Sequence, residues 1–252
     1  MRINKYLLFL SIGILLNQTT TAESFTETWQ GAPKFNIHLY TFAADVDGSI
    51  KKGPINYHVD QPVEETLKHL DRSFMAYADL RKGAWGIYTD LQSVKTSQEK
   101  SVMSLPIALR TQLKQNNYGI YYQAYISPEV TAQNYPKMIV EPTIGIHRTK
   151  TEATLTLLNQ HLETETQWNE FFWGTRFKYN FDSPWNLASE LTFGAENTLS
   201  THAYLGYRIP VQDQHLTLRV GYRYLEQDYK SKDFHWDIRQ HGPVIGINLP
   251  IF

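Results

Sequence analysis

Apolar and polar residues alternate along several stretches of the chain, and the stretch 243–252 shows this pattern clearly. Its apolar row has a period of two and consists of Ile245, Ile247, Leu249 and Ile251. A period of two predicts a β-strand with one apolar face, because successive side chains of a strand point to opposite sides. The segments 171–181, 185–193, 199–209 and 216–224 repeat the arrangement, with charged, polar or small residues on the second face.

The first half of the chain predicts further strands at 35–40, 74–80 and 85–91. Two longer segments, 104–127 and 138–159, each exceed the roughly 9–11 residues of a membrane-crossing β-strand. Each is either one strand that continues beyond the bilayer or a hairpin, so the total is about ten or about twelve strands, and we favour ten. In the first of these segments the apolar parity changes at 114–117, and a bulge or a turn would produce such a change.

The first 22 residues predict a secretory signal peptide. Arg2 and Lys5 give a positive start, residues 6–16 form an apolar run, and 20–22 are small residues suited to cleavage. The apolar run is shorter than the ~20 residues of a membrane-spanning helix. The chain contains no cysteine, which excludes a lipid-anchored form, a disulfide framework and cysteine-ligated metal.

Together, the export signal and the alternating segments predict an all-β fold. We expect a transmembrane, up-and-down antiparallel β-barrel of about ten strands, with twelve as the alternative, filling residues 23–252 as a single domain. An even strand number places both termini in the periplasm of a Gram-negative cell, with short turns there and longer loops outside. The polar segment 45–71 is the expected long extracellular loop, and residues 63–70 within it predict a short helix.

Aromatic residues and net charge refine this expectation. The chain has 16 tyrosines, 12 phenylalanines and 6 tryptophans, which is a large aromatic content for an otherwise polar chain. A barrel requires such a composition when only alternate residues face lipid. The tryptophans and other aromatics near predicted strand ends indicate girdles at the membrane interfaces. The net charge of −1 gives no basic footprint for nucleic acid.

Two groups of short motifs are similar to those of a known family. The first group is Met75, Asp79, Arg81-Lys82-Gly83, Trp85-Gly86 and Asp90, and the second is Gly206-Tyr207-Arg208, Gly221-Tyr222-Arg223 and Gly242-Pro243 with Gly246. They resemble the paired-strand motif and the closing strands of an uncharacterised proteobacterial outer-membrane β-barrel family. The resemblance implies a ten-stranded barrel, and it implies no activity.

If the apolar rows face lipid, ten charged residues face the lumen. They are Asp79, Arg81, Asp90, Glu141, Arg176, Lys178, Glu190, Arg208, Arg219 and Arg223. We expect them to pair with one another and to seal the lumen, because barrels of about eight strands are filled by side chains and open channels appear at roughly sixteen. The alternative is a narrow anion-preferring pore, with its constriction at Arg219 and Arg223.

A catalytic site is a weaker expectation. Asp45 and Asp47 follow the first predicted strand, Asp233 and His235 begin the last one, and barrel closure makes these strands neighbours. Such groups can activate a water molecule, as in the outer-membrane aspartyl proteases called omptins. The compositions 47–49 and 230–233 are also typical of solvated turns, which is the interpretation we favour.

The remaining expectations concern partners. We expect contacts with outer-membrane lipid and lipopolysaccharide, recognition of the C-terminal strand by the outer-membrane assembly machinery, no nucleic acid and a monomeric state. The nine histidines show no metal-ligand spacing, so we expect neither metal nor cofactor.

Overall fold

A computed structural model of the chain describes residues 31–102, 105–157, 160–211 and 214–251. The predicted signal peptide, residues 1–22, lies outside the described residues. Among the described residues, no helix has both the length and the apolar character needed to cross a membrane.

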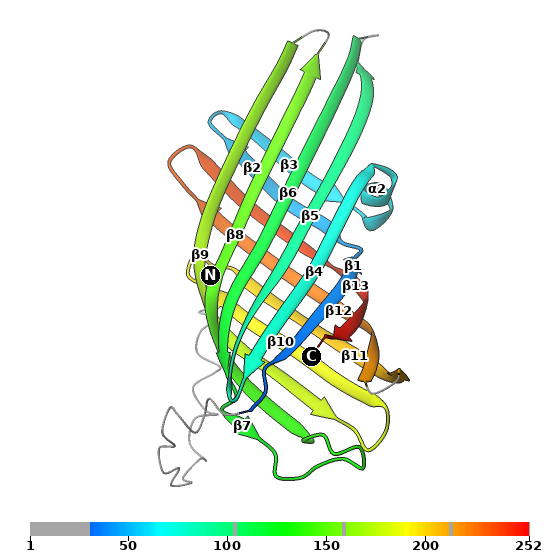
Figure 1. Ribbon diagram of the computed structural model, residues 1–252. Coiled ribbons are helices and arrows are strands. Elements are labelled where there is room, and N and C mark those ends of the chain that lie inside the picture. Colours follow the sequence, from blue (N-terminus) through cyan, green and yellow to red (C-terminus); the bar gives the residue numbers. More distant parts are fainter. Residues whose placement is uncertain (1–30, 103–104, 158–159, 212–213, 252) are drawn as a thin grey trace, which may run out of the picture.

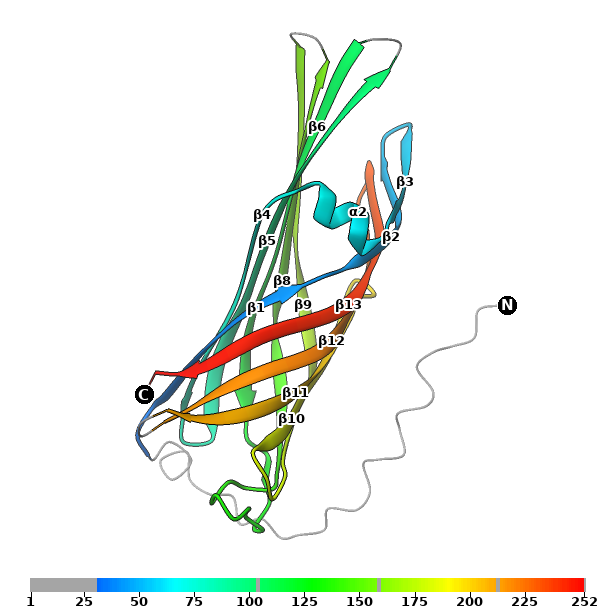
Figure 2. The same ribbon diagram turned by 90° about the vertical axis from the view of Figure 1, so that its right-hand side faces the viewer.

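Ten antiparallel strands form a closed barrel (Figures 1 and 2). In barrel order they are β1 (Lys34–Phe42), β4 (Leu70–Lys82), β5 (Trp85–Val102), β6 (Leu105–Tyr122), β8 (Met138–Leu157), β9 (Gln160–Asn180), β10 (Trp185–Gly194), β11 (Leu199–Val211), β12 (Gln214–Lys230) and β13 (Phe234–Pro250). The barrel closes where β1 pairs with β13, from Asn36 opposite Pro250 to Phe42 opposite Val244. The predicted all-β barrel of about ten strands is therefore confirmed.

Three short strands and one helix lie outside the barrel order. They are β2 (Asp45–Lys52), β3 (Ile55–Gln61), β7 (Tyr125–Ile126) and α2 (Val63–Lys68). We call the end of the barrel that carries the turns at 83–84 and 181–184 the base. We call the other end, with β2, β3, α2 and the parts of β5, β6, β8 and β9 that rise beyond the shorter strands, the extension (Figure 1).

Each of the two long segments contributes one strand to the barrel, β6 or β8, so the twelve-strand alternative is wrong. β6 pairs with β8 from Ile107 opposite Leu157 to Tyr121 opposite Thr143, with no shift of register. The parity change at 114–117 needs neither bulge nor turn. Leu113 packs inward against an apolar cluster in the extension, whereas Ile120 is exposed on the outside near the base. The apolar residues change faces along one continuous strand because their apolar surroundings lie inside in the extension and outside near the base.

The apolar cluster in the extension consists of Val59, Trp168, Phe234, Trp236 and Ile238. It joins β3, β9 and β13, which are distant in sequence. The ring centroid of Trp168 lies 5.6 Å from that of Trp236 and 4.7 Å from that of Tyr229. Burial of these large rings away from water stabilises the extension.

The segment 45–71, expected to be a loop, has regular structure over most of its length. β2 pairs with the upper part of β13, from Asp45 opposite His241 to Lys52 opposite Phe234, and β3 pairs with β2. Val46 and Ile50 pack against the apolar cluster, to which β13 contributes Phe234, Trp236 and Ile238. The predicted helix is present as α2, whose first turn contains Glu64 and Glu65 and whose last turn contains Lys68, in agreement with the helix dipole.

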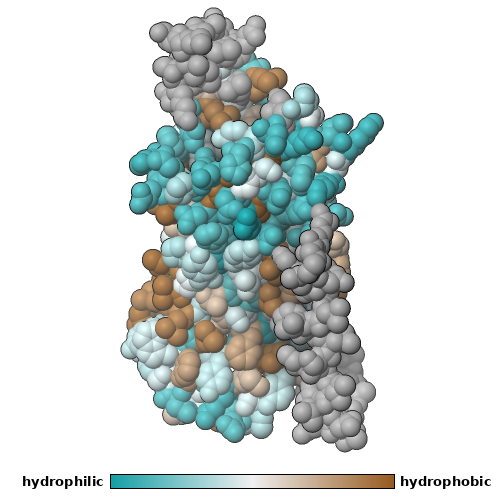
Figure 3. Space-filling view, turned by 180° about the vertical axis from the view of Figure 1, so that it is seen from behind, coloured by the Kyte–Doolittle hydropathy of each residue, from teal (hydrophilic) through white to brown (hydrophobic). Residues whose placement is uncertain are grey.

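The outer surface of the base half is apolar. Figure 3 shows apolar residues gathered in the lower half of the face in view and hydrophilic residues above them. On β9, Phe171 and Trp173 are 53% and 58% exposed, and Phe181, which directly follows the strand, is 40% exposed. These residues span 11 positions, 171 to 181, which matches the ~9–11 residues of a tilted strand crossing a membrane.

Two glycines on the inner surface make room for tyrosine rings. Gly86 lies opposite Tyr121 and Gly119 lies opposite Tyr88 in the pairing of β5 with β6. A Cβ atom on Gly86 would lie 2.1 Å from Cζ of Tyr121, and one on Gly119 would lie 2.3 Å from Cε1 of Tyr88. Each ring therefore lies across the neighbouring strand, which only a glycine permits.

We expect Gly86→Ala to destabilise the folded barrel by about 1–3 kcal/mol, because the added methyl group displaces a buried ring. The measurement is the urea midpoint of folding into lipid vesicles. Ile87→Val also changes one methyl group but faces outward on the same strand, so it should leave the midpoint nearly unchanged. Equal midpoints for the two variants would contradict the ring-over-glycine packing.

Candidate functional site

The ten charged residues expected in the lumen lie on the inner face of their strands. Six of them are buried: Asp79, Asp90, Glu141, Arg176, Glu190 and Arg223. The other four, Arg81, Lys178, Arg208 and Arg219, are half-buried. Strand alternation places these side chains inside, and the register of the strands decides which of them meet.

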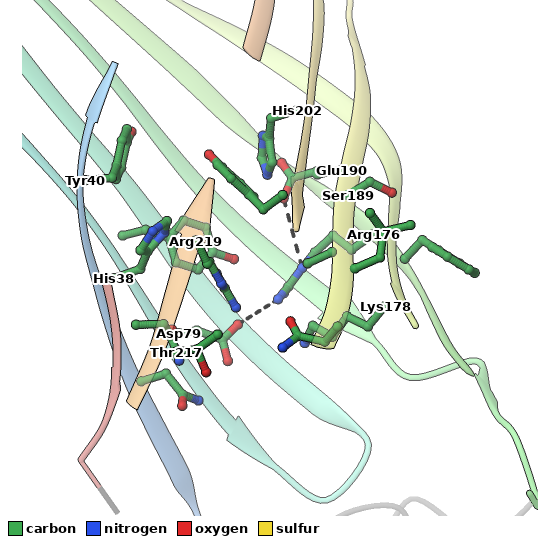
Figure 4. Close-up of a pocket in the computed structure, with 18 of the residues that line it drawn as sticks. His38, Tyr40, Asp79, Arg176, Lys178, Ser189, Glu190, His202, Thr217 and Arg219 are labelled. Carbon is green, nitrogen blue, oxygen red and sulfur yellow. Dashed lines mark hydrogen bonds and ion pairs between the residues drawn. The ribbon is translucent and has the colours of Figure 1, made fainter. Parts of the chain in front are cut away.

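Arg176 on β9 is the centre of the main ion-pair network (Figure 4). Its Nη2 atom donates a hydrogen bond to Asp79 Oδ2 at 2.9 Å, and its Nε atom lies 3.4 Å from Glu141 Oε2 and 4.0 Å from Glu190 Oε2. These carboxylates come from β4, β8 and β10. One guanidinium therefore joins four strands through contacts that are strong because they are charge-assisted and shielded from water.

Glu141, which is fully buried, has additional partners on the base side of Arg176. Lys178 Nζ lies 3.3 Å from Glu141 Oε2, and Gln123 Nε2 donates a hydrogen bond to Glu141 Oε1 at 2.8 Å. Arg81 Nη1 in turn donates to Gln123 Oε1 at 2.6 Å. Arg81 therefore reaches the network through an amide and not through a carboxylate.

A second, smaller network lies closer to the extension. Arg223 Nη1 donates a hydrogen bond to Asp90 Oδ2 at 2.8 Å and another to the hydroxyl of Tyr40 at 3.2 Å. The same Tyr40 hydroxyl donates to Asp90 Oδ1. Above it, Gln227 accepts a hydrogen bond from Gln115 at 3.0 Å and donates one to Thr149 at 3.2 Å.

Arg208 and Arg219, like Arg81, form no ion pair with a carboxylate of the described residues, whereas Arg176, Lys178 and Arg223 do. Arg208 donates to the side-chain oxygen of Asn180 and lies with its guanidinium carbon 4.1 Å from the ring centroid of Tyr135. Arg219 lies 6.0 Å from the ring centroid of Tyr204. Both line a cavity of ≈ 230 Å³, and Figure 4 draws most of the residues that line it.

Tyrosines complete the network, and sequence reasoning did not include them. The guanidinium carbon of Arg176 lies 3.9 Å from the ring centroid of Tyr121, whose hydroxyl donates to Asp79 at 3.0 Å. Tyr88 donates to Glu190 at 3.3 Å. The spacing of glycine and tyrosine on β5 and β6 was the available signal, since each ring lies over a glycine of the other strand.

The four acidic and histidine residues of the protease alternative do not form one group. Asp47 pairs with Arg239 at 3.1 Å and lies opposite it in the register. His235 lies opposite Lys51, four positions further along β2, and its Nε2 atom contacts Asp228 at 2.9 Å. At ~3.3 Å per residue this offset separates His235 from Asp47 by about 13 Å along the strand. Asp45 lies opposite His241, while Asp233 lies in the turn between β12 and β13.

A separate charge cluster lies on the outer surface of the extension. Lys150 Nζ lies 2.8 Å from Glu152 and 2.9 Å from Glu165. The hydrogen bond from Lys150 lowers the pKa of the Glu152 carboxyl below its ordinary value, outweighing burial, and Lys114 and Lys95 add attraction. The same hydrogen bonds raise the pKa of Lys150.

Lys150→Met is expected to shift the titration of Glu152 to higher pH. A carboxyl whose pKa is lowered in the folded state stabilises the fold at pH values above its unfolded-state pKa of about 4.3. This stabilisation is lost as the pH falls through the lower pKa of the folded state. The shift can be followed by ¹³C NMR of the Glu152 carboxyl carbon. Lys230→Met, in the turn region of β12, should leave the Glu152 titration unchanged, and an equal shift in both variants would contradict this assignment.

Comparison with known proteins gives a fold likeness only. No protein-family model and no curated protein matches the sequence, so the resemblance to an outer-membrane barrel family stays a prediction. Among solved structures, one similar protein is Ail, the attachment invasion locus protein of Yersinia pestis, in complex with the heparin analogue sucrose octasulfate. It is 11% identical to this chain with a TM-score of 0.43, and the match covers 87% of this chain and 100% of that one.

Two further structures are similar at the same level. CdiB from Acinetobacter baumannii is 12% identical with a TM-score of 0.41, covering 80% of this chain and 40% of that chain. The translocator domain of the autotransporter NalP from Neisseria meningitidis is 8% identical with a TM-score of 0.37, covering 88% of this chain and 90% of that one.

Proposed function

We propose that this protein is an integral β-barrel of the Gram-negative outer membrane, with a lumen that ion pairs seal and an extension that projects from the cell surface. The observation that carries the proposal is the opposition of two surfaces. Apolar side chains cover the outside of the base half, while the charged residues of the same strands are buried within. A protein surface with this distribution is stable in a bilayer and not in water.

Aromatic residues support two membrane boundaries. Near the base, Trp85 lies with its ring centroid 5.0 Å from that of Tyr122, and Trp185 lies 4.9 Å from Tyr207. Toward the extension, Trp173 lies 5.1 Å from Phe193. Aromatic girdles of this kind flank the apolar band of outer-membrane barrels.

Three successive layers support a closed lumen. The Arg176 network lies nearest the base, the Arg223–Asp90 pair with the Gln115–Gln227 hydrogen bond lies above it, and the apolar cluster around Trp236 follows. An ion crossing the barrel would have to break paired charges and then enter an apolar layer. Both steps are unfavourable.

The orientation and partners follow from the same proposal. The first residue of β1, Lys34, and the last residue of β13, Pro250, lie at the base, and an even strand number places both of these ends in the periplasm, so the base is periplasmic and the extension extracellular. Export depends on the predicted signal peptide. Outer-membrane lipid and lipopolysaccharide surround the apolar band, and the assembly machinery recognises the C-terminal strand.

Conductance in planar bilayers tests the proposal. The refolded protein should insert, run as a heat-modifiable band on gels, and give no stepwise current in salt solutions. Stable anion-selective steps from the same preparation would contradict sealing and establish the narrow pore instead. A chain that stays monomeric in water without detergent or lipid would contradict membrane insertion altogether.

A further inference from the structure

The base half of the lumen contains an excess of hydrogen-bond donors around one cavity. The lining of this cavity of ≈ 230 Å³ includes four cations, Arg176, Lys178, Arg208 and Arg219, and three carboxylates, Asp79, Asp90 and Glu190. Asp79 and Glu190 contact Arg176, and Asp90 contacts Arg223, so all three carboxylates already have a cationic partner. Arg208 and Arg219 are therefore the uncompensated charges of the cavity.

The donor excess is visible atom by atom. Among the described residues, three arginines that line the cavity have a buried N–H donor without a hydrogen-bond partner, Arg176 Nη1, Arg208 Nη1 and Arg219 Nε, and His38 Nε2, a donor in one of its two tautomers, also has none. A buried donor without a partner costs free energy, and a buried unpaired charge costs more. A small group that carries negative charge and several acceptor oxygens would satisfy these donors together.

The backbone around Arg219 lets two polar side chains lie close to it. Its direct neighbours are Gly206 on β11 and Gly246 on β13. His38 lies over Gly246, where a Cβ atom would be 2.4 Å from its Nε2, and Asn186 lies over Gly206 in the same way. Arg208 is the diagonal neighbour of Arg219, about 7–8 Å away on the same face. Arg219, Arg208 and His38 therefore line the same cavity from the nearby strands β12, β11 and β1.

Access to the cavity is from the base. Asn36, Thr217 and Asn248 line it and lie close to the base ends of β1, β12 and β13. The other side is closed by the Arg223–Asp90 pair and, beyond it, the apolar cluster of the extension.

We propose that this cavity is a binding site for a small oxyanion, a phosphate or sulfate group, held by Arg219 and Arg208 with His38. The site is blind, so it binds an anion from the base side without conducting it. A phosphate group reaches the base in two forms, as free inorganic phosphate and as the headgroup of a phospholipid, and the site recognises the chemistry that they share.

Calorimetric titration of the refolded full-length mature chain tests the proposal. In a nonionic detergent without phosphate groups, inorganic phosphate should bind saturably to the wild type. Arg219→Gln should weaken binding on the order of tenfold or more, because it removes a charge-assisted donor pair. Arg148→Gln removes an exposed arginine on the outer surface of β8 and should bind as the wild type does.

A second titration separates the two sources. If short-chain phosphatidylglycerol binds in an Arg219-dependent manner and inorganic phosphate does not, the lipid headgroup is the ligand. If Arg219→Gln fails to fold, Arg219→Lys and His38→Gln replace it, and each should bind more weakly than the wild type. The proposal is overturned if neither probe binds saturably, or if the Arg219 and His38 variants bind with the affinity of the wild type. Conductance is measured separately, so a conducting barrel that binds phosphate contradicts sealing and leaves this site intact.

Discussion

Replacing Arg176 with methionine is expected to destabilise the folded barrel by about 3–5 kcal/mol, because it leaves buried carboxylates without their common cation. Asp79, Glu141 and Glu190 all lie within 4.0 Å of the Arg176 guanidinium. Lys178 still reaches Glu141, but no other cation of the described residues pairs with Asp79 or Glu190. The measurement is the free energy of unfolding in urea, with the protein folded into lipid vesicles.

Two controls separate loss of charge from loss of packing. Arg148→Met makes the same chemical change on the exposed outer surface, where about 0.5 kcal/mol or less is expected. Adding Asp79→Asn and Glu141→Gln to Arg176→Met should recover part of the lost stability, because the penalty comes from uncompensated charge. Wild-type stability of Arg176→Met alone would contradict a structural role for the network.

Trp236→Ala is expected to open the extension and leave the barrel closed. Trp236 is buried between Trp168 and Phe234, and large-to-small changes of buried aromatic residues cost about 3–5 kcal/mol. A loss of about 3 kcal/mol confined to the extension accelerates amide exchange there by over a hundredfold.

Hydrogen–deuterium exchange locates this effect. Amides in the pairing of β2 with β13, such as Ile50, should exchange much faster in Trp236→Ala, while those in the pairing of Val220 with Ile245 should not change. Tyr57→Ala is the matched control, because Tyr57 belongs to the same extension and is 53% exposed. Uniform acceleration along the whole chain would show that the extension and the barrel unfold as one unit.

The alternation of residue types determined much of this protein from the sequence alone. Because side chains of a strand alternate strictly, an apolar row at 216–224 implies that Arg219 and Arg223 face the other way, and the same logic applies to every barrel strand. The burial of Asp79, Asp90 and Arg176 on inner faces follows from this local geometry, without knowledge of distant contacts. The alternation left ten and twelve strands open, and the continuous pairing of β6 with β8 decided for ten.

Only the tertiary structure decided which inward charges meet. Asp79 and Arg176 are 97 positions apart, and their contact depends on the stagger of the closed barrel, which no local pattern encodes. That Arg208 and Arg219 have no carboxylate partner among the described residues is equally a result of closure. The alternation also did not predict the extension, because the apolar side chains there face inward. Leu113 and Ile50 point to the inside, where an interpretation with apolar residues facing the membrane places polar residues. A strand fixes the side to which each residue points, and the fold decides what lies on that side.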